Sequence, residues 1–472
     1  MKNWNKTKII ATIGPASRNK RVLTAMMHAG ADLFRINGAH GTLEEHRNAI
    51  SLIRTIAKKQ DTPIGILLDL PGPKFRVGVL KHDPFCLHSG DHVTLACGQT
   101  KQTDDRIPIP HKDIHCALKT GDKIFINDGI VELHVMKVSK KNVECTVKAG
   151  GEIGTHKGIN LPKTKLEIPS LTAQDKKILA FAVKQDVDYI ALSFVRSAND
   201  ILALRKILKR TAPHIRIVAK IEKPEALDDI DRIIDVSDAV MVARGDLGIE
   251  MPFNKIPIIQ RTILKKCMAA GKPSITATQM LESMIHAKKP TRAEATDVAG
   301  AVWEGSDAVM LSAETSVGEN PAAAVDAMRE IAKEAEKEMP HFDFTKATAD
   351  TDSLQAQVLS CAAGFVAEQL GAKAIVTPTR SGRTPLFVSR DRPNVFILAP
   401  TEYESTARRM SLYWGVKPMA MPRFSTVDEL LGHAEKVALK SGYIRKGDKI
   451  VITSGAHGRK NDITKLVEVR QV

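Results

Sequence analysis

The chain has 472 residues, of which 43% are hydrophobic and 26% are charged; this balance is typical of globular proteins and excludes a disordered, collagen-like or membrane-embedded chain. At roughly 150 residues per domain, the length suggests about three domains. The 69 Lys and Arg against 54 Asp and Glu give a formal net charge of +15, which is typical of a solvated basic surface or of a protein that binds small phosphorylated anions.

Two kinds of partner are disfavoured. Aromatic residues make up only 4% of the chain, too few for a nucleic-acid stacking platform, and the basic residues are spread along the chain rather than gathered in tails. The first residues, MKNWNKTKIIATIGPAS, lack the apolar stretch of a secretion signal, and no run of about 18 apolar residues occurs. We therefore expect neither nucleic acid nor a membrane as a partner.

The cysteines indicate the compartment. None of them forms a Cys-x-x-Cys pair, and their spacing fits neither a zinc site nor a disulfide framework. A reducing cytoplasm is therefore expected. The six are Cys86, Cys97, Cys116, Cys145, Cys267 and Cys361.

A recurring unit runs through most of the chain. In each copy a short apolar, β-branched run ends in polar or charged residues, and a helical pattern often follows. Such alternation indicates parallel strands covered on both faces. Eight runs match the strand count of a closed (β/α)8 barrel; an open doubly wound sheet is the alternative, and the count and the charged run ends favour the barrel. The runs are KIIATIG (8–14), LFRINGAH (33–40), IGILLDL (64–70), YIALSFV (189–195), IRIVAKIE (215–222), AVMVARGD (239–246), SITATQM (274–280) and AVMLSAET (308–315).

The regularity breaks between Leu70 and about Ile168, where Gly, Pro and Asp are frequent and the apolar pieces are short. Gly-rich turns between such pieces are typical of hairpins, so we expect a small all-β domain inserted after the third barrel strand. The barrel resumes at Pro169, where Thr172 and Asp175 form a near capping box that predicts the start of a helix.

After about Glu338 a polar connector leads to a third segment in which strands and helices alternate again, as a separate open α/β domain. The predicted fold class is α/β: a (β/α)8 TIM barrel with an inserted small all-β domain and a C-terminal open α/β domain. The expected domain limits are 1–70 and 169–340 for the two parts of the barrel, 71–168 for the insertion and 341–472 for the C-terminal domain.

Catalytic groups of such barrels come from the C-terminal ends of the strands. The last polar residues of the eight runs combine cations, carboxylates and hydroxyls around one mouth. They are Arg35, Asn37, His40, Asp69, Lys220, Glu222, Asp246, Thr278, Ser312 and Glu314.

Three of these residues suggest a metal site. Lys220 and Glu222 are two apart, so on a strand they face the same way. Glu222 and Asp246 come from neighbouring strands and form a two-carboxylate site for a hard cation such as Mg²⁺. Each motif has a plain alternative: a salt-bridged strand end for Lys220 and Glu222, and a helix cap for Asp246.

The segment Ala243–Gly248 follows one of these strands and opens a helix. Free backbone N–H groups at a helix start bind carboxylate or phosphate, and glycines let a ligand approach closely. A tight turn that simply needs glycine is the alternative.

Nine stretches together resemble the pyruvate kinase family, and the resemblance covers essentially the whole chain. The longest, from Pro290 to Thr315, is highly specific. The others are TKIIATIGPAS (7–17), RINGAHG (35–41), LDLPGPKFRVG (68–78), LSFVR (192–196), AKIEKPEAL (219–227), ARGDLGIE (243–250), ATQMLESM (277–284) and TRSGRTPLFVSRDRP (379–393).

The resemblance implies an enzyme that transfers the phosphoryl group of phosphoenolpyruvate to ADP, the last step of glycolysis. Glu222 and Asp246 are then the ligands of Mg²⁺ or Mn²⁺. Lys220 neutralises charge on the phosphoryl group and the enolate, and Arg35 reaches the same phosphate.

The resemblance also implies the remaining roles at the mouth. Amides around Gly245 and Asp246, together with Thr278, bind the substrate carboxylate. Thr278, Ser312 and Glu314 are candidates for protonating the enolate. Asn37, His40 and Arg76 lie where ADP or ATP binds, and the inserted domain is a lid that excludes water.

One corner departs from the family pattern. Members usually have Asn-Phe-Ser-His-Gly where this chain has Asn37-Gly38-Ala39-His40-Gly41, and many have Asp-Thr-Lys-Gly-Pro-Glu where it has Asp69-Leu70-Pro71-Gly72-Pro73-Lys74. Asn37, Asp69 and the Leu70 carbonyl remain as ligands of the family's K⁺ ion, but Ala39 has lost the hydroxyl. We expect the Lys74 ammonium to take the place of the ion, so that K⁺ is not required; Lys74 pointing into solvent is the alternative.

The C-terminal domain is expected to be regulatory. The loop Thr379-Arg380-Ser381-Gly382-Arg383-Thr384 resembles the family's binding loop for a phosphorylated effector, a sugar phosphate or AMP, whereas the opposing loop GAHGRKND fits the family poorly. A solvated basic loop is the alternative. By family analogy the enzyme is a homotetramer.

Two other functions compete with this interpretation. One is a metal-dependent lyase on a related barrel, which would need neither a lid nor a nucleotide site. The other is a non-catalytic relative, which only the altered corner at Gly38 and Ala39 supports.

Overall fold

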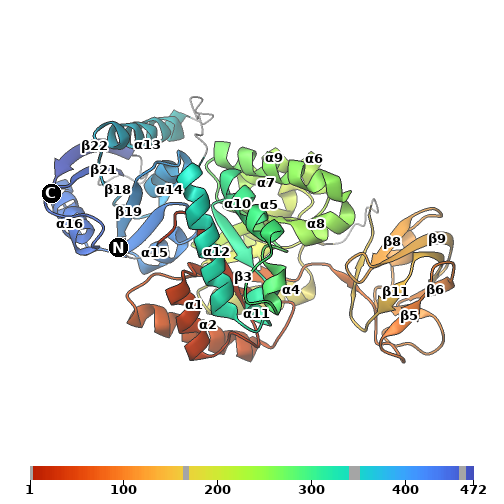
Figure 1. Cartoon of the computed structure of the whole chain (residues 1–472). Coiled ribbons are helices and arrows are strands. Elements are labelled where there is room, and N and C mark those ends of the chain that lie inside the picture. The colour runs from red at the N-terminus through yellow and green to blue at the C-terminus, as the bar shows by residue number, and fades with distance from the viewer. Residues whose placement is uncertain (1–3, 163–168, 340–350, 456–463) are drawn as a thin grey trace.

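The chain folds into three parts arranged in a row, with the barrel in the middle, the inserted domain at one end and the C-terminal domain at the other (Figure 1). The computed structural model describes residues 4–162, 169–339, 351–455 and 464–472. Both chain ends lie in or beside the C-terminal domain. In the described residues no helix is long and apolar enough to cross a membrane.

The central part is a closed barrel of eight strands in the order β1-β17-β16-β15-β14-β13-β3-β2. Neighbouring strands are parallel throughout. Every predicted apolar run contributes one strand, so the closed barrel is confirmed over the open sheet. The strands are β1 (Lys8–Ile13), β2 (Leu33–Asn37), β3 (Gly65–Leu70), β13 (Tyr189–Leu192), β14 (Arg216–Ile221), β15 (Ala239–Ala243), β16 (Ser274–Ala277) and β17 (Ala308–Leu311).

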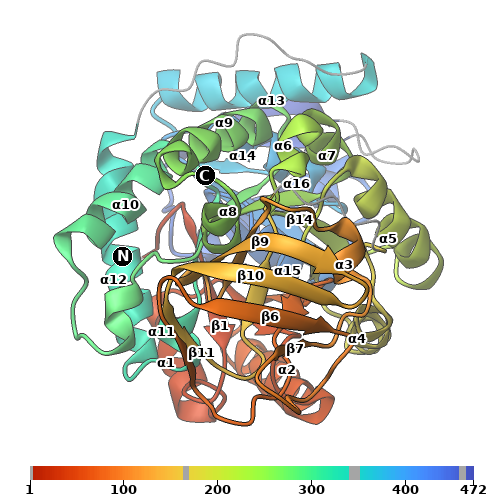
Figure 2. The same ribbon diagram turned by 90° about the vertical axis from the view of Figure 1, so that its right-hand side faces the viewer.

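Helices surround the barrel strands because their apolar faces pack on the outer side of the sheet (Figure 2). The predicted capping box is confirmed at the start of α4: Asp175 N donates to Thr172 Oγ1 over 3.0 Å, and Thr172 N donates to the Asp175 carboxylate over 2.8 Å. The helices are α1 (Lys20–Ala29), α2 (Leu43–Lys59), α4 (Ala173–Lys184), α5 (Ala198–Thr211), α6 (Glu225–Asp228), α7 (Ile230–Val236), α8 (Arg244–Glu250), α9 (Ile256–Ala269), α10 (Arg292–Trp303), α11 (Ala313–Ser316) and α12 (Pro321–Ala335), with 3₁₀ turns η1 (Phe253–Lys255), η2 (Glu282–Ile285) and η3 (Glu336–Glu338).

The inserted domain, called the lid below, follows β3 and precedes the next barrel strand, as predicted. It has its own apolar core, a seven-stranded sheet in the order β4-β12-β8-β9-β10-β6-β7, and a separate β5–β11 pair. In Figure 2 its sheet stands in front of the barrel. The chain enters through β4 and leaves through β12, which pair antiparallel. The elements are β4 (Phe75–Arg76), β5 (Phe85–Leu87), β6 (His92–Cys97), β7 (Ile107–Ile109), α3 (Ile114–Ala117), β8 (Lys123–Ile126), β9 (Val131–Ser139), β10 (Asn142–Ala149), β11 (Gly151–Ile153) and β12 (Gly158–Asn160). The one-turn helix α3 is the departure from an all-β prediction.

The C-terminal domain is an open five-stranded sheet in the order β20-β19-β18-β21-β22, with only β22 antiparallel to its neighbour. This agrees with the predicted open α/β domain. The elements are α13 (Thr351–Gln369), β18 (Ala374–Val376), α14 (Arg383–Arg390), β19 (Phe396–Thr401), α15 (Glu404–Met410), β20 (Val416–Ala420), α16 (Val427–Lys440), β21 (Lys449–Gly455) and β22 (Thr464–Gln471).

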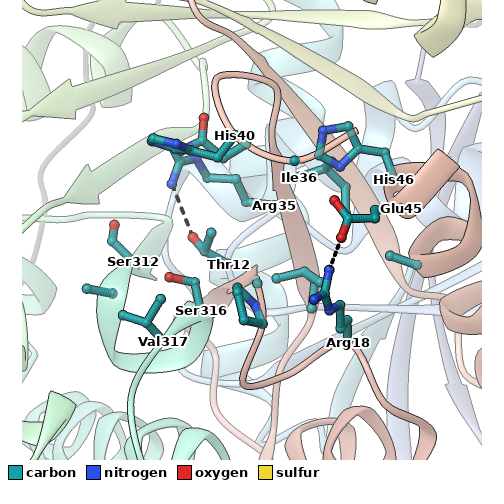
Figure 3. A pocket seen from close by; sticks show the side chains of 17 residues that line it. Thr12, Arg18, Arg35, Ile36, His40, Glu45, His46, Ser312, Ser316 and Val317 are labelled. Carbon is teal, nitrogen blue, oxygen red and sulfur yellow. Dashed lines mark hydrogen bonds and ion pairs between the residues drawn. The ribbon is translucent and has the colours of Figure 1, made fainter. Parts of the chain in front are cut away.

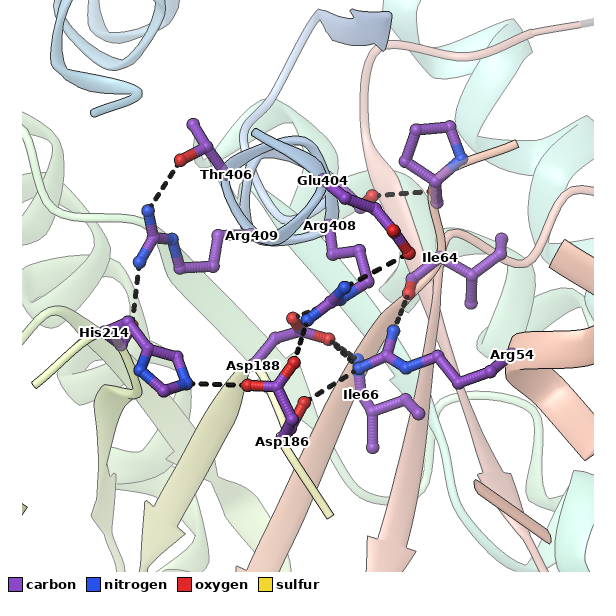
Figure 4. A network of polar contacts seen from close by, with 12 residues as sticks. Arg54, Ile64, Ile66, Asp186, Asp188, His214, Glu404, Thr406, Arg408 and Arg409 are labelled. Atoms are coloured by element: carbon purple, nitrogen blue, oxygen red, sulfur yellow. Dashed lines mark hydrogen bonds and ion pairs between the residues drawn. The ribbon is translucent and has the colours of Figure 1, made fainter. Parts of the chain in front are cut away.

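A network of charged side chains joins α15 to the end of the barrel away from the lid (Figure 4). The Asp188 carboxylate, 1% exposed, accepts from Arg408 Nε of α15 and from the Arg54 guanidinium of α2, each over 2.8 Å. Asp186 adds ion pairs with Arg408 over 2.6 Å and with His214 over 2.7 Å. Since a buried charge is tolerated only when it is paired, this network fixes α15 on the barrel.

The N-terminal segment lies against the C-terminal domain rather than against the barrel alone. Lys6 accepts a hydrogen bond at its carbonyl from Gly415 N over 2.8 Å, and its ammonium donates to Asn394 O over 2.8 Å. The buried Lys8 ammonium donates to Val416 O over 2.8 Å. The first and last parts of the sequence therefore form one packing unit.

Candidate active site

The predicted site residues gather at one end of the barrel, because the C-terminal ends of parallel strands meet there. This end faces the lid (Figure 2). By strand they are Arg35, Asn37 and the following His40 (β2), Asp69 (β3), Lys220 and Glu222 (β14), Asp246 (after β15), Thr278 (after β16), and Ser312 and Glu314 (after β17).

Asp69 lies at the centre of the mouth between two cations. Its side chain is 2% exposed, and its Oδ2 atom accepts from Arg35 over 2.7 and 2.9 Å and lies 3.2 Å from Lys220 Nζ. Burial alone would raise the pKa of Asp69, but attraction to Lys220 and Arg35 outweighs it and lowers the pKa below its usual 3.8. Asp69 is therefore the fixed anion that keeps both cations in the mouth.

Lys220 is held on three sides. Its ammonium lies 2.8 Å from Glu222 Oε1 and donates to Ser193 Oγ over 2.7 Å, in addition to the Asp69 contact. Burial lowers the pKa of Lys220, but the attraction of Asp69 and Glu222 outweighs it, and the pKa is raised. A buried, permanently charged ammonium is thus presented at the mouth.

Glu222 and Asp246 carry the two carboxylates that sequence analysis assigned to a divalent cation. Burial raises the pKa of Glu222, and repulsion from Asp246 adds to it, so a positive charge between them would be stabilised. Asp246 makes no cap bond in α8, which removes the helix-cap alternative. In the described part of the chain no group of three or more His, Cys, Asp or Glu side chains forms a metal site; the two hard carboxylates instead fit a cation that keeps waters.

Lys74 has a partner that the sequence did not predict. Its ammonium donates to Asp246 Oδ1 over 2.8 Å, while its charge also reaches His40, in the corner where we expected Lys74 to lie. The Lys74 side chain is only 21% exposed, so it does not point into solvent either. The side chain passes over Gly158 of β12, where an added Cβ would lie 2.8 Å from Lys74 Cε; the missing side chain leaves room for this path.

Thr278 is held in a strained backbone conformation beside α8. Its φ is +71°, which is unusual for a β-branched residue. The Arg244 guanidinium of α8 donates to Thr278 O over 2.6 Å and pairs with Asp297 over 2.7 Å. Thr278 Oγ1 accepts from Gly245 N over 2.7 Å. The strain therefore brings the Thr278 hydroxyl to the amide that sequence analysis assigned to the substrate carboxylate.

Ser312 and Glu314 differ in their surroundings. Ser312 Oγ is buried and has no hydrogen-bond partner among the described residues. The Glu314 carboxylate accepts from Ser312 N over 2.7 Å and from Leu281 N over 3.1 Å. Burial raises the pKa of Glu314, although backbone N–H groups that donate to its carboxylate oppose the shift.

A cavity of about 580 Å³ opens beside Arg35 (Figure 3). Predicted residues Arg35, Asn37, His40 and Ser312 line it, whereas Arg76 does not. Burial lowers the pKa of His40, and repulsion from Arg76, Arg35 and Lys74 lowers it further, so the imidazole is neutral in a cationic neighbourhood that suits anionic phosphates.

The predicted effector loop lies between β18 and α14. Gly382 has a φ of +85° and its N–H donates to Thr379 Oγ1 over 2.9 Å. The Arg383 N–H contacts Ser381 Oγ over 3.4 Å, and Thr384 is buried. Arg380 pairs with Glu402 over 2.8 Å, which the sequence did not predict. Most of the opposing loop GAHGRKND lies outside the described residues.

Two positioning residues were missed. Ser193 accepts from Lys220 and also lies 3.2 Å from Asp69 Oδ1. It is the last polar residue of the run YIALSFV, which is the feature by which residues were selected from the other runs. Arg244 belongs to the segment ARGDLG, in which sequence analysis assigned roles only to Gly245 and Asp246.

The comparisons with known proteins agree along the chain. Residues 4–325 match the family described as "Pyruvate kinase, barrel domain", and residues 357–469 match "Pyruvate kinase, alpha/beta domain". A pyruvate kinase of Clostridium acetobutylicum is 40% identical over 470 residues, covering 99% of each chain. Pyruvate kinases of Geobacillus stearothermophilus and Staphylococcus haemolyticus are 40% and 41% identical, over 99% of this chain and 80% of their own length.

The central role of Asp69 yields a stability prediction. Asp69→Asn leaves Arg35 and Lys220 short of a buried partner, so the free energy of unfolding should fall by about 3–5 kcal/mol at pH 7. Because the pKa of Asp69 is lowered from 3.8, this contribution is complete above pH 3.8 and is lost as the pH falls further. Urea unfolding of wild type and variant at a series of pH values measures the difference.

Ser193→Ala is the matched control, because it removes a hydrogen bond from the same cluster without changing a charge. It should cost only about 1 kcal/mol. Equal losses in the two variants would contradict the assigned role of Asp69.

Proposed function

The chain belongs to the pyruvate kinase family and is a kinase, and we propose the following roles for its residues in moving the phosphoryl group of phosphoenolpyruvate to ADP. The observation that carries the proposal is the buried ammonium of Lys220, held between Asp69 and Glu222 and beside Arg35. Phosphoryl transfer needs charge neutralisation and positioning more than covalent catalysis, and this arrangement supplies both.

Lys220 and Arg35 bind the phosphoryl oxygens. When phosphate leaves, negative charge develops on the enolate oxygen, and preorganised cations in a dry site stabilise it most effectively. Glu222 and Asp246 would hold Mg²⁺ or Mn²⁺, which would neutralise charge on the phosphoryl group and the enolate. Because Asp246 now accepts from Lys74, the Lys74 ammonium must move aside for that cation.

The substrate carboxylate is assigned to the start of α8. The backbone amides of Gly245 and Asp246 and the Thr278 hydroxyl are the proposed donors, and Arg244 holds the strained loop in place. The Gly245 N–H now donates to Thr278 Oγ1, and the Thr278 hydroxyl donates to Ala277 O, so these two bonds have to open when the carboxylate binds. Thr278, Ser312 and Glu314 remain the candidates for delivering a proton to the enolate carbon. Ser312 is favoured by its unpartnered hydroxyl, and Glu314 by its raised pKa.

ADP is assigned to the cavity of Figure 3. Asn37 and His40 line it next to Arg35, so the nucleotide and the phosphoryl group would lie side by side. Arg76 belongs to the lid and affects the pKa of His40, which supports a role in binding the nucleotide phosphates from the lid side.

Lys220→Met tests the reaction assignment. Turnover should fall by about 10²–10³-fold, since one preorganised electrostatic group is worth roughly 2.7–4 kcal/mol in the transition state, while phosphoenolpyruvate affinity should change much less. Pyruvate formation is measured with and without ADP. A variant that keeps most of its turnover would refute the role of Lys220.

Exposed Lys206→Met is the control and should keep full turnover. The ADP arm separates the functions. Pyruvate formation only with ADP supports the kinase, and formation without ADP would indicate transfer of the phosphoryl group to water. No formation by the wild type would reject the kinase and support a lyase with another substrate or a non-catalytic relative.

We propose that the enzyme works without K⁺. Ala39 offers no hydroxyl, and Gly38 lets its loop approach β3 so closely that an added Cβ would lie 2.6 Å from Asp69 O. The Lys74 ammonium supplies a positive charge in the same mouth: it now lies at Asp246, and once a divalent cation takes its place there it is available to stand in for K⁺. The interaction energy between such a charge and an anionic group about 4 Å away is about 4 kcal/mol at an effective dielectric near 20.

Activity in tetramethylammonium buffer should therefore equal activity in K⁺ buffer. Lys74→Glu should lower activity and make the remainder respond to K⁺, whereas Lys81→Glu, the same change at an exposed lid position, should do neither. A wild-type rate that rises tenfold or more with K⁺, about 1.4 kcal/mol, would overturn the proposal.

We also propose a phosphorylated allosteric effector on the loop from Thr379 to Thr384. Gly382 is left-handed and α14 begins directly after it, so the loop lies at the N-terminus of a helix, where anions bind. The N–H groups of Gly382 and Arg383 now donate within the loop and would exchange these partners for the anion. Glu402 holds Arg380 in place beside this loop. The effector would be a sugar phosphate or AMP.

At sub-saturating phosphoenolpyruvate, one of a panel of sugar phosphates or AMP should activate the enzyme. The double variant Ser381→Ala with Thr384→Ala should lose this activation and keep the basal rate. No activation by any compound would reject the site.

A homotetramer and a cytoplasmic location complete the proposal. Exposed apolar side chains support self-association: Phe253, next to α9, is 87% exposed, and Phe365 on α13 is 64% exposed. All six cysteines are unpaired, which fits a reducing compartment.

A further inference from the structure

Three contacts connect the lid to helix α8. Lys74, next to β4, donates to Asp246. The turn at Gly129 lies against α8, since an added Cβ there would be 3.8 Å from Ile249. Asn160, the last residue of β12, donates through Nδ2 to Glu250 Oε1 over 3.1 Å. The helix that begins at the proposed substrate and metal groups is therefore also the helix on which the lid rests.

The contact between Asn160 and Glu250 is the most deeply buried of the three. Asn160 is 4% exposed and the Glu250 side chain is 1% exposed. Glu250 Oε1 also pairs with Lys223 Nζ over 2.6 Å, and Lys223 directly follows Glu222 in the sequence. Because a buried carboxylate must keep its partners, the cluster ties β12 to the ends of β14 and α8.

The cluster leaves two acceptors unused. Glu250 Oε2 and Asn160 Oδ1 are buried and have no hydrogen-bond partner among the described residues. Buried polar atoms without partners are rare and costly. Two of them at the joint between two domains can accept hydrogen bonds from further donors, water or protein, without breaking the bond from Asn160 Nδ2 to Glu250 Oε1.

We propose that Asn160 and Glu250 form the hinge anchor of the lid and act as positioning residues for the reaction. Their hydrogen bond holds β12 on α8 while the rest of the lid turns. Arg76 of β4 is paired with Gly158 of β12, so fixing β12 also fixes where Arg76 meets the nucleotide. This inference rests on the proposed nucleotide role of Arg76.

A charge exchange tests the anchor. Asn160→Asp places a carboxylate against that of Glu250, so KM for ADP should rise and kcat should fall, together by about tenfold in kcat/KM. Phosphoenolpyruvate affinity should stay within about twofold, because its proposed ligands lie on the barrel. The double variant N160D/E250Q restores a donor and an acceptor with the roles reversed, and should recover most of the loss.

Controls separate positioning from folding. Asn142→Asp makes the same chemical change in a lid strand away from α8. It should leave KM for ADP, kcat and the affinity for phosphoenolpyruvate unchanged. Urea unfolding identifies a variant that fails to fold; Asn160→Ala, which breaks the bond without adding charge, then replaces N160D and should show the same ADP-specific loss.

The outcomes are distinct. An ADP-specific loss with N160D and recovery in the double variant supports the anchor. An unchanged KM for ADP in N160D and N160A, or equal losses in N160D and the double variant, overturns it. A wild type that forms no pyruvate from phosphoenolpyruvate and ADP would instead overturn the proposed function, so the two failures are distinguishable.

Discussion

One negative charge organises the mouth of this barrel. Asp69 is buried between Arg35 and Lys220 and pairs with both; Glu222 is a second partner of Lys220, so Asp69 is the carboxylate that the two cations share, and buried cations need such partners. Ion pairing offsets the free-energy cost of burying these charges. The two cations are therefore in position before any substrate binds. Such preorganisation is what gives electrostatic catalysis its strength, because no solvent has to rearrange during the reaction.

Helix α8 has a second organising role. Although it has only seven residues, its first residue clamps the strained Thr278, its third is a metal-type carboxylate, and its last holds the lid strand β12. The groups proposed to bind the substrate carboxylate and the cation therefore share one short element with the contact to the lid. A displacement of α8 itself would change all three together, whereas a change confined to the contact with β12 would alter the position of the lid alone.

The sequence was sufficient for the architecture and for most of the mouth, but not for its finer contacts. Eight apolar runs with polar ends predict parallel strands whose C-terminal ends meet at one end of the barrel. The sequence alone therefore predicts that Arg35, Lys220, Glu222 and Asp246 lie at the same end. Lys74 could not be placed, because a lysine has four rotatable bonds and several carboxylates lay within reach. The contact between Asn160 and Glu250 joins residues 90 apart and follows no periodic pattern. Such side-chain pairs depend on how the domains pack, which local propensity does not encode.

The position of the N-terminal segment bears on biosynthesis. Lys6 and Lys8 leave the ribosome first, yet their partners Asn394, Gly415 and Val416 belong to the last fifth of the chain. Strand β1 also closes the barrel against β17, which is made late. Domains generally fold as they emerge during synthesis, but this barrel stays open until β17, which ends at Leu311, has been made, about two thirds of the way along the chain. Until then the nascent chain exposes unpaired strand edges, and Lys6 and Lys8 find their partners only when the C-terminal domain has been made.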